Sequence, residues 1–313
     1  MFLNKLCKIC QSPFSNEYTF REMMFGFRDP FIYYECSGCG CLQIAEVPAD
    51  IERYYPSYYY SFNSTVPALQ KRKSGIRGLV NQLLKDKKER RLQKEASGYL
   101  KPINITNQHR ILDIGCGKGE LICRLFNMGF EHVSGTDKYL PEEINHDFGV
   151  KIMKKDLKDI EAEAYDLLMM HHVFEHMFFP EEELRECHRI LKAKSYLMIR
   201  IPIKGFAWEK YKQDWVQLDA PRHFFIHTLK SMKILAEKTG FIIPHIIFDS
   251  TPFQFEGSEL YKRDMPLHDE TTHRPNSVKS ILNKKERMFF KEETKRLNED
   301  GTGDQAVFYL YKE

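Results

Sequence analysis

The chain of 313 residues lacks three features that would settle its class early. It has no run of roughly 18 or more apolar residues, so no membrane-spanning helix is predicted. Its beginning, MFLNKLCKIC, contains no apolar stretch long enough for a secretory signal. Neither charge sign dominates, because 47 Lys and Arg against 44 Asp and Glu give a net charge of +3. That balance by itself indicates neither a nucleic-acid nor an anionic-membrane partner. We therefore expect a cytoplasmic protein.

Cysteine, by contrast, is concentrated near the amino terminus. Cys7 and Cys10 form one C-x-x-C pair, and Cys36 and Cys39 form a second. Two such pairs, each on a tight turn, supply the four thiolates of a tetrahedral Zn²⁺ site. Since four protein ligands leave no open position, the pattern predicts structural zinc, with Cys41 as an alternative ligand.

The region after about residue 101 alternates short apolar runs with amphipathic stretches. The runs are Arg110–Ile114, His132–Thr136, Tyr165–Met170 and Ser195–Ile201. Buried parallel strands joined by crossover helices produce this alternation. The sequence therefore predicts an α/β fold.

A glycine-rich loop follows the first of these strands. Gly115, Gly117 and Gly119 are spaced G-x-G-x-G, with the small Cys116 between them, and a helix is expected from Glu120. Glycine lets the backbone bend sharply and leaves room for a ligand against the turn. The spacing differs from the G-x-G-x-x-G of dinucleotide-binding proteins.

Three acidic residues accompany this loop at the expected ends of strands. Asp113 precedes it, where a carboxylate would repel a pyrophosphate but could hold an ammonium group. Asp137 ends the second strand, in the position from which a carboxylate accepts both ribose hydroxyls. Asp156 follows the next strand and could accept from an adenine amino group. Because such ends meet at one sheet edge, the pattern favours a nucleoside with a cationic amino-acid portion.

These motifs resemble the class I S-adenosylmethionine-dependent methyltransferases. Tyr165–His176 is similar to that family's fourth strand and its H-V-L-E-H segment. Arg189–Pro202 is similar to its R-x-L-K-P-G-G turn and fifth strand, although Ala193–Ser195 replaces Pro-Gly-Gly. Leu218–His223 and the closing strand Gln305–Lys312 also match.

The resemblance implies a Rossmann-like sheet of seven strands, with Gln305–Lys312 inserted antiparallel beside Phe241–Asp249. It implies S-adenosylmethionine as cofactor, and the amino-terminal module resembles that of bacterial sugar methyltransferases. The acceptor it implies is a sugar, either a nucleotide-sugar or a surface glycan. The cofactor residues implied by the resemblance are Asp113, Gly115, Cys116, Gly117, Gly119, Asp137, Lys138, Asp156, Leu157, His171 and His172.

Two alternatives to this function stay open. One is an RNA base methyltransferase that holds nucleic acid with its zinc module, against which the net charge of only +3 argues. The other is a zinc-ribbon adaptor with an inert methyltransferase fold. The presence of the glycine loop with Asp113 and Asp137 argues against that one.

Histidines supply the candidate catalytic groups. His172, Glu175 and His176 match the H-x-x-E-H of inverted zinc proteases, but the first histidine directly follows a buried strand instead of lying within a helix. We expect Glu175 and His176 to begin the next helix and to face the acceptor, unless His176 merely packs there. In the loop after the fifth strand, His223 could take a proton from the acceptor. Arg222 could bind a phosphate or carboxylate, or simply pair within a surface loop.

The predicted domains follow one another along the chain. Residues 1–65 form the zinc module, 66–100 a basic linker helix and 101–313 the catalytic domain, with a lid inserted at about 251–300. The stretch 76–91 has an apolar stripe and a basic face. We expect its stripe to pack on the neighbouring domain, with peripheral contact to an anionic membrane as the alternative.

Overall fold

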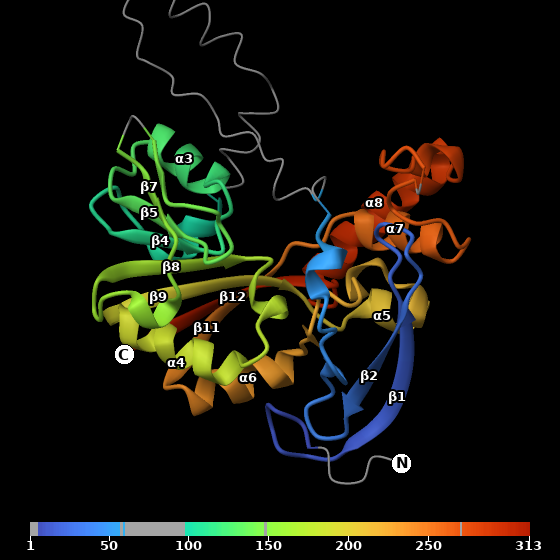
Figure 1. Cartoon of the computed structure of the whole chain (residues 1–313), viewed down its shortest axis with the longest axis horizontal. Coiled ribbons are helices and arrows are strands. Elements are labelled where there is room, and N and C mark those ends of the chain that lie inside the picture. The colour runs from blue at the N-terminus through green and yellow to red at the C-terminus, as the bar shows by residue number, and fades with distance from the viewer. Residues whose placement is uncertain (1–5, 57–58, 60–97, 147–148, 270) are drawn as a thin grey trace, which may run out of the picture. The chain divides into compact units, whose positions relative to one another are not determined.

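The computed structural model describes residues 6–56, 59, 98–146, 149–269 and 271–313 (Figure 1). The basic helix predicted for 76–91 lies outside these residues and stays a prediction. Within the described ranges, no helix combines the length and the apolar character needed to cross a membrane.

The chain divides into two compact units. The first comprises Met1–Tyr58, His172–Arg185 and Ile199–Leu310, and the second comprises Tyr59–His171, Glu186–Met198 and Tyr311–Glu313. The first unit therefore combines amino-terminal residues with two later segments, whereas the predicted domains are consecutive.

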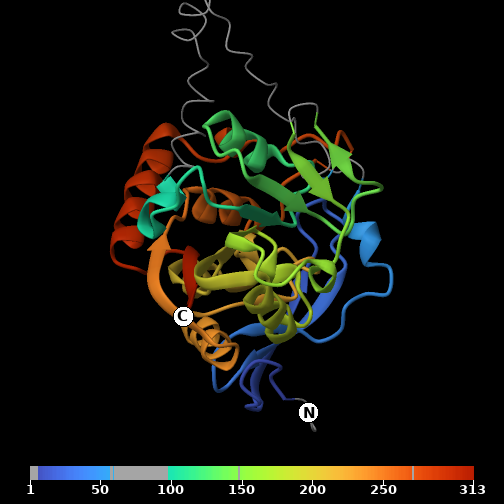
Figure 2. The same ribbon diagram turned by 90° about the vertical axis from the view of Figure 1, so that its left-hand side faces the viewer.

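The second unit contains the parallel strands that the sequence predicts. They are β4 (Ile111–Ile114), β5 (Val133–Thr136), β7 (Lys151–Met153) and β8 (Tyr165–His171). β4 pairs in parallel with β5 and β8, and β5 pairs in parallel with β7. All four β4 residues are buried, as expected for a strand covered on both faces. The helix α3 (Glu120–Asn127) packs against β5 (Figures 1 and 2).

The larger sheet has the strand order β11-β12-β9-β8-β4-β5-β7-β6 in the described part of the chain. Its other strands are β6 (Ile144–Asn145), β9 (Leu191–Pro202), β11 (Phe241–Phe248) and β12 (Gln305–Lys312). The prediction of seven strands is corrected to eight. The added β6 has two residues, too few to give a pattern in the sequence, and it pairs antiparallel with β7.

The closing strand β12 lies between β9 and β11. The amide of Asp249, just after β11, donates a hydrogen bond of 3.2 Å to the carbonyl of Gln305, the first residue of β12. The end of one strand thus meets the beginning of the other. This arrangement agrees with the predicted antiparallel insertion.

A smaller antiparallel sheet belongs to the first unit. Its order is β1 (Phe14–Arg21), β2 (Pro30–Cys36), β3 (Leu42–Ile44) and β10 (Phe225–Ile226). β10 comes much later in the chain than its neighbour β3, with which Phe225 pairs at Gln43. The amino-terminal segment is therefore completed by a strand from the later part of the chain.

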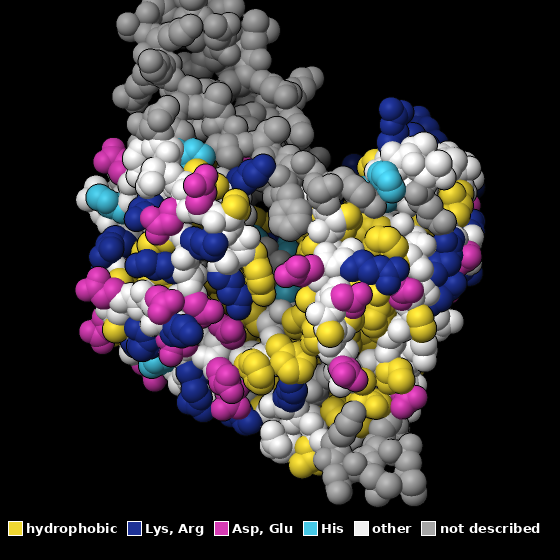
Figure 3. Space-filling view, in the orientation of Figure 1, with side chains coloured by type: hydrophobic (Ala, Val, Ile, Leu, Met, Phe, Trp, Pro, Cys, Tyr) yellow, Lys and Arg dark blue, Asp and Glu magenta, His cyan; other side chains and the backbone are white. Residues whose placement is uncertain are grey.

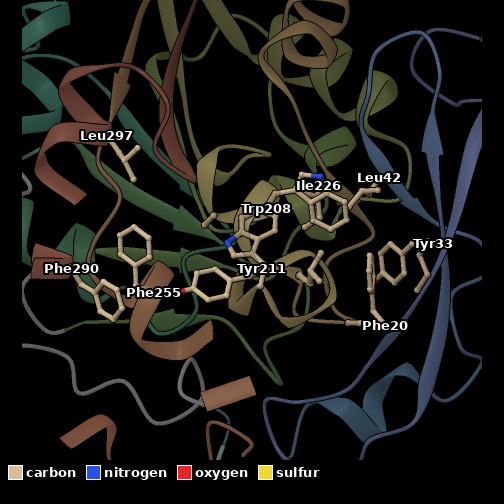
Figure 4. Close-up of a cluster of buried hydrophobic side chains, with 14 of the residues drawn as sticks. Phe20, Tyr33, Leu42, Trp208, Tyr211, Ile226, Phe255, Phe290 and Leu297 are labelled. Atoms are coloured by element: carbon tan, nitrogen blue, oxygen red, sulfur yellow. The ribbon is translucent and has the colours of Figure 1, made fainter. Parts of the chain in front are cut away.

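The core of the first unit is aromatic and draws on the same distant segments (Figure 4). α5 (Phe206–Tyr211) contributes Trp208, whose ring meets that of Phe20 at 6.0 Å, edge to face. α7 (Phe253–Tyr261) and α8 (Lys284–Glu299) add rings that stack at 4.8 Å. A segment as short as the amino-terminal one buries little apolar surface by itself. It gains a core by packing with these helices.

The remaining helices include α4 (Pro180–Ile190), α6 (Leu229–Lys238) and the 3-10 turns η1 (Ile51–Tyr54), η3 (Lys101–Ile103), η4 (Leu157–Asp159), η5 (Phe174–His176), η6 (Lys212–Asp214), η7 (Val216–Leu218) and η8 (Val278–Ser280). Thr228 caps α6, with its side chain accepting a hydrogen bond from the amide of Ser231. Glu175 and His176 lie in the short 3-10 helix η5, whereas we expected them to begin the next helix, α4, which starts only at Pro180. Proline disfavours helical backbone at the preceding residue but suits a first helical position, so α4 begins at Pro180.

Candidate functional site

The four paired cysteines meet in the first unit, as predicted. One sulfur from each of Cys7, Cys10, Cys36 and Cys39 lies within 4.8 Å of every other. The Sγ atoms of Cys7 and Cys39 are 3.7 Å apart, and those of Cys10 and Cys36 are 3.3 Å apart. Four sulfurs bound tetrahedrally to zinc lie about 3.8 Å from one another. The donor set therefore fits Zn²⁺.

The surrounding backbone supports thiolates at this cluster. The amide of Ile9 donates to Cys7 Sγ at 3.3 Å, and the amide of Gly38 donates to Cys36 Sγ at 3.3 Å. Such bonds stabilise negative charge on sulfur. Cys41 lies beside the cluster, with its Sγ 3.4 Å from that of Cys39, and Gln43 Nε2 contacts Cys7 Sγ at 2.8 Å.

In the second unit, the three loop glycines adopt the conformation for which we expected glycine. Gly115, Gly117 and Gly119 have φ angles of 66°, 54° and 82°, a region that residues with a Cβ rarely occupy. A Cβ on Gly119 would also lie 2.5 Å from the Cδ1 atom of Ile152. Cys116 is half-buried within this loop.

Asp113 and Asp137 are brought together next to the loop. Asp113 is buried, and burial, followed by the charge of Asp137, raises its pKa to about 8. Asp137 Oδ2 accepts the amide of Gly117 at 3.0 Å, and its Oδ1 accepts the amide of Tyr139 at 2.9 Å. Asp113 lies in β4 and Asp137 directly follows β5, so both are at one edge of the parallel strands, as predicted.

The other predicted cofactor residues in this unit differ from one another in burial and in their contacts. Asp156 precedes η4, and its carboxylate lies 3.8 Å from Lys138 Nζ. Leu157 is buried behind it. His171 ends β8, and its ring meets the ring of Tyr99 at 5.4 Å.

His172 belongs to the first unit and has partners there. Its φ angle of 54° turns the chain directly after β8. Its Nδ1 lies 3.3 Å from Glu175 Oε1, and its Nε2 contacts Arg200 Nη1 at 2.6 Å. Arg200 in turn donates to Asp249. Both ring nitrogens of this predicted cofactor residue are thus directed at side chains of the protein.

The two predicted catalytic histidines lie together with Glu175 in the first unit. One ligand-type atom from each of Glu175, His176 and His223 lies within 4.8 Å of the other two. The rings of His176 and His223 meet edge to face at 4.8 Å. Burial lowers the pKa of His223 to about 4, so its imidazole is neutral near pH 7.

Glu175 is fully buried yet ionised. Burial alone would raise its pKa, but His172, His176 and His223 outweigh that effect and lower it to about 2. The sequence motif contains this residue but gives no sign that its carboxylate is buried beside His223, which comes 48 positions later.

Arg222 is not directed at a ligand, in contrast to the binding role considered for it. The side chain is fully buried, and its Nη2 donates to Glu22 at 2.7 Å and to Asp219 at 2.6 Å. Its Nη1 donates to the carbonyl of Tyr54. Sequence reasoning missed Glu22, because nothing near it in the chain indicates a partner 200 positions away.

Comparison with known proteins identifies the family to which this chain belongs. A family model described as a methyltransferase domain matches residues 69–245. No sequence among curated proteins is significantly similar to this chain.

Solved structures are similar only at a distance. A SAM-dependent methyltransferase from Archaeoglobus fulgidus shares 19% identity, covers 76% of this chain and 100% of its own, and has a TM-score of 0.42. A SAM-dependent methyltransferase from Thermotoga maritima shares 17% identity, covers 75% of this chain and 97% of its own, and has a TM-score of 0.42. A geranyl diphosphate C-methyltransferase from Streptomyces coelicolor shares 11% identity, covers 74% of this chain and 86% of its own, and has a TM-score of 0.46. At these values the acceptor has to be argued from this chain's own residues.

Proposed function

The chain belongs to the methyltransferase-domain family, and from that premise we propose that it transfers the methyl group of S-adenosylmethionine to a sugar, either nucleotide-linked or part of a surface glycan. Family membership confirms the enzyme class expected from the sequence. The observation that carries the cofactor assignment is the glycine loop with Asp113 and Asp137 at one edge of the parallel strands.

Each group at this edge has a role in the proposed complex. Asp113 would hold the cofactor's ammonium group, since a buried carboxylate gains most from a cation. Asp137 would exchange its backbone partners for the ribose hydroxyls, and Asp156 would accept from the adenine amino group. The glycine loop leaves space for the amino-acid portion. Lys138, Leu157, His171 and His172 complete the proposed cofactor residues.

Methyl transfer requires little covalent chemistry from the protein. When bound, S-adenosylmethionine would supply a methyl group on a sulfonium, from which the acceptor's nucleophilic atom would displace S-adenosylhomocysteine. What remains for the protein is to align the acceptor with the methyl group and to remove the acceptor's proton. We assign the proton to His223 or His176, which is supported by the neutral state of the His223 imidazole.

The amino-terminal cysteines would hold one structural Zn²⁺ in this proposal. The close sulfur distances and the amide donors at Cys7 and Cys36 support it. No disulfide joins the cysteines of the described residues, and we place the reaction in the reducing cytoplasm.

A sugar acceptor is favoured over RNA on the grounds of charge. On the face seen in Figure 3, basic and acidic side chains are interspersed over the described surface and form no continuous basic stripe. A protein that neutralises several phosphates needs such a stripe. The resemblance of the zinc module to that of sugar methyltransferases supports the same choice.

Calorimetry tests the proposal directly. Zinc-loaded protein is titrated with S-adenosylmethionine, in the wild type, in Asp137→Ala and in the matched control Asp159→Ala, which changes an exposed acid in η4. We expect binding in the wild type and control, and a loss of at least tenfold in affinity in Asp137→Ala. Absence of binding, or binding unchanged by Asp137→Ala, would overturn the cofactor assignment.

The acceptor class needs a separate assay. Transfer of labelled methyl groups is measured with a panel of nucleotide-sugars and, in parallel, with RNA. Methylated RNA whose formation declines steeply with salt would replace the sugar proposal by the RNA alternative.

A further inference from the structure

We infer that Glu175, His176 and His223 bind a divalent transition-metal cation, at a second metal site separate from the cysteine cluster. One ligand-type atom from each residue lies within 4.8 Å of the other two. Glu175 and His176 come from η5, and His223 comes from the loop before β10. All three belong to the first unit.

The orientation of the two imidazoles fits metal binding. His176 Nδ1 lies 2.7 Å from the carbonyl of Arg222, and His223 Nδ1 lies 2.9 Å from the carbonyl of Gln217. A carbonyl only accepts, so each Nδ1 carries the hydrogen, and Nε2 is the nitrogen of each ring through which a metal would be bound. Metal-binding histidines characteristically donate their other ring N–H to a carbonyl or carboxylate in this way.

The Glu175 carboxylate supplies an independent indication. Its side chain is fully buried, and its Oε2 atom has no hydrogen-bond partner among the described residues. The other oxygen, Oε1, lies 3.3 Å from His172 Nδ1. A buried carboxylate oxygen without a donor is costly, and a bound cation removes that cost.

The separation of the Glu175 and His223 ligand atoms requires only a small adjustment to suit a bound metal ion. Glu175 Oε1 and His223 Nε2 are 3.9 Å apart, whereas two such atoms on a tetrahedral zinc ion lie about 3.3 Å apart. Asp219 Oδ2 is 3.8 Å from the same nitrogen but is held by Arg222. The site thus has three protein ligands and an open position, and two imidazoles with one carboxylate suit Zn²⁺, Co²⁺ or Fe²⁺ better than Mg²⁺ or Ca²⁺.

The ligand set also explains the H-x-x-E-H motif. A protease would use both histidines of the motif, but His172 is engaged by Arg200. His223 takes its place. The open position would then receive an acceptor oxygen, a role that rests on the proposed function. A hydroxyl bound to the cation loses its proton more readily. A bound cation would therefore take over the activation of the acceptor that the proposed function assigns, for the metal-free protein, to His223 or His176.

Cobalt titration of the full-length protein tests the site. The cysteine cluster is first filled with one equivalent of Zn²⁺, and Co²⁺ is then added while the visible spectrum is recorded. We expect one further equivalent to bind, with weak ligand-field bands and no thiolate-to-cobalt charge-transfer bands. Glu175→Gln and His223→Gln should each bind cobalt at least tenfold more weakly. His245→Gln, a change at an exposed histidine of β11, should bind it like the wild type.

Retained zinc and an unchanged circular dichroism spectrum identify variants that still fold. No second equivalent in the wild type, or undiminished binding in both folded variants, overturns the inference. Strong charge-transfer bands do so too, because they mean that cobalt has entered the cysteine cluster. Binding of S-adenosylmethionine is measured on the same sample: cofactor binding without cobalt binding overturns the metal site alone, and the reverse overturns the proposed cofactor assignment alone.

Discussion

Asp113 and Glu175 are two buried carboxylates with opposite electrostatic surroundings. The pKa of Asp113 is raised to about 8 by burial and by Asp137, whereas the histidines around Glu175 outweigh burial and lower its pKa to about 2. Burial disfavours the charge in both. The difference teaches that the neighbouring charges decide. Beside Asp113 the described residues place a second carboxylate, that of Asp137, whereas beside Glu175 they place histidines.

The largest effect is expected where the first unit loses such a partner. Arg222 lies between the buried carboxylate of Glu22 and the half-buried carboxylate of Asp219. Arg222→Met leaves both without their cation, and should lower the free energy of unfolding by about 3–5 kcal/mol in chemical denaturation. Arg185→Met removes a surface ion pair with Glu181 and should cost less than about 1 kcal/mol. Equal effects in the two variants would mean that the buried network is not stabilising.

A smaller effect, dependent on pH, is expected at Asp113. Between its ordinary pKa of 3.8 and its folded value of about 8, the folded state holds a proton that the unfolded state has released. Stability therefore falls as pH rises through this window, by about 1.4 kcal/mol per pH unit. Asp113→Asn removes this dependence.

Denaturation at pH 5 and pH 7 measures the difference. The wild type should lose about 2–3 kcal/mol relative to Asp113→Asn between these values. The variant should also lose affinity for S-adenosylmethionine, because it cannot pair with an ammonium group. Asp159→Asn serves as the exposed control. A pH dependence identical in wild type and Asp113→Asn contradicts the raised pKa.

Crowding at the glycine loop gives the next effect. Gly119→Ala combines a φ angle of 82° with a contact of 2.5 Å to Ile152. Gly129 has a φ angle of 101° but nothing within 4 Å of the added Cβ, so Gly129→Ala isolates the backbone strain. We expect about 2 kcal/mol of destabilisation for the first and about 1 kcal/mol for the second. Only the first should weaken cofactor binding in calorimetry.

The same contrast determines how much could be predicted from the sequence. The glycine loop, Asp113 and Asp137 lie within 25 residues and follow local rules of strand ends and backbone conformation. The C-x-x-C pairs are equally local. The structure brings their four sulfurs together and gives the loop glycines positive φ angles, while zinc and cofactor binding stay predictions. The partners of Arg222 and Glu175 come from positions as distant as Glu22 and His223, brought together by packing. The two residues of β6 are too few to leave a pattern in the sequence, and Pro180 sets the start of α4 after the H-x-x-E-H motif.

The smallest effect concerns the one ligand choice that the sequence left open. Cys41 Sγ lies 3.4 Å from Cys39 Sγ, but the four predicted ligands already form a complete group. If Cys41 only packs beside them, Cys41→Ser keeps one equivalent of zinc and changes the free energy of unfolding by less than about 1 kcal/mol. Gln43 Nε2, 3.4 Å from Cys41 Sγ, can donate to the new hydroxyl. Cys39→Ser, the matched change at a ligand, should release zinc to a chelator far more readily. Zinc lost equally from both variants would make Cys41 a ligand, and the two C-x-x-C pairs would then no longer account for the site.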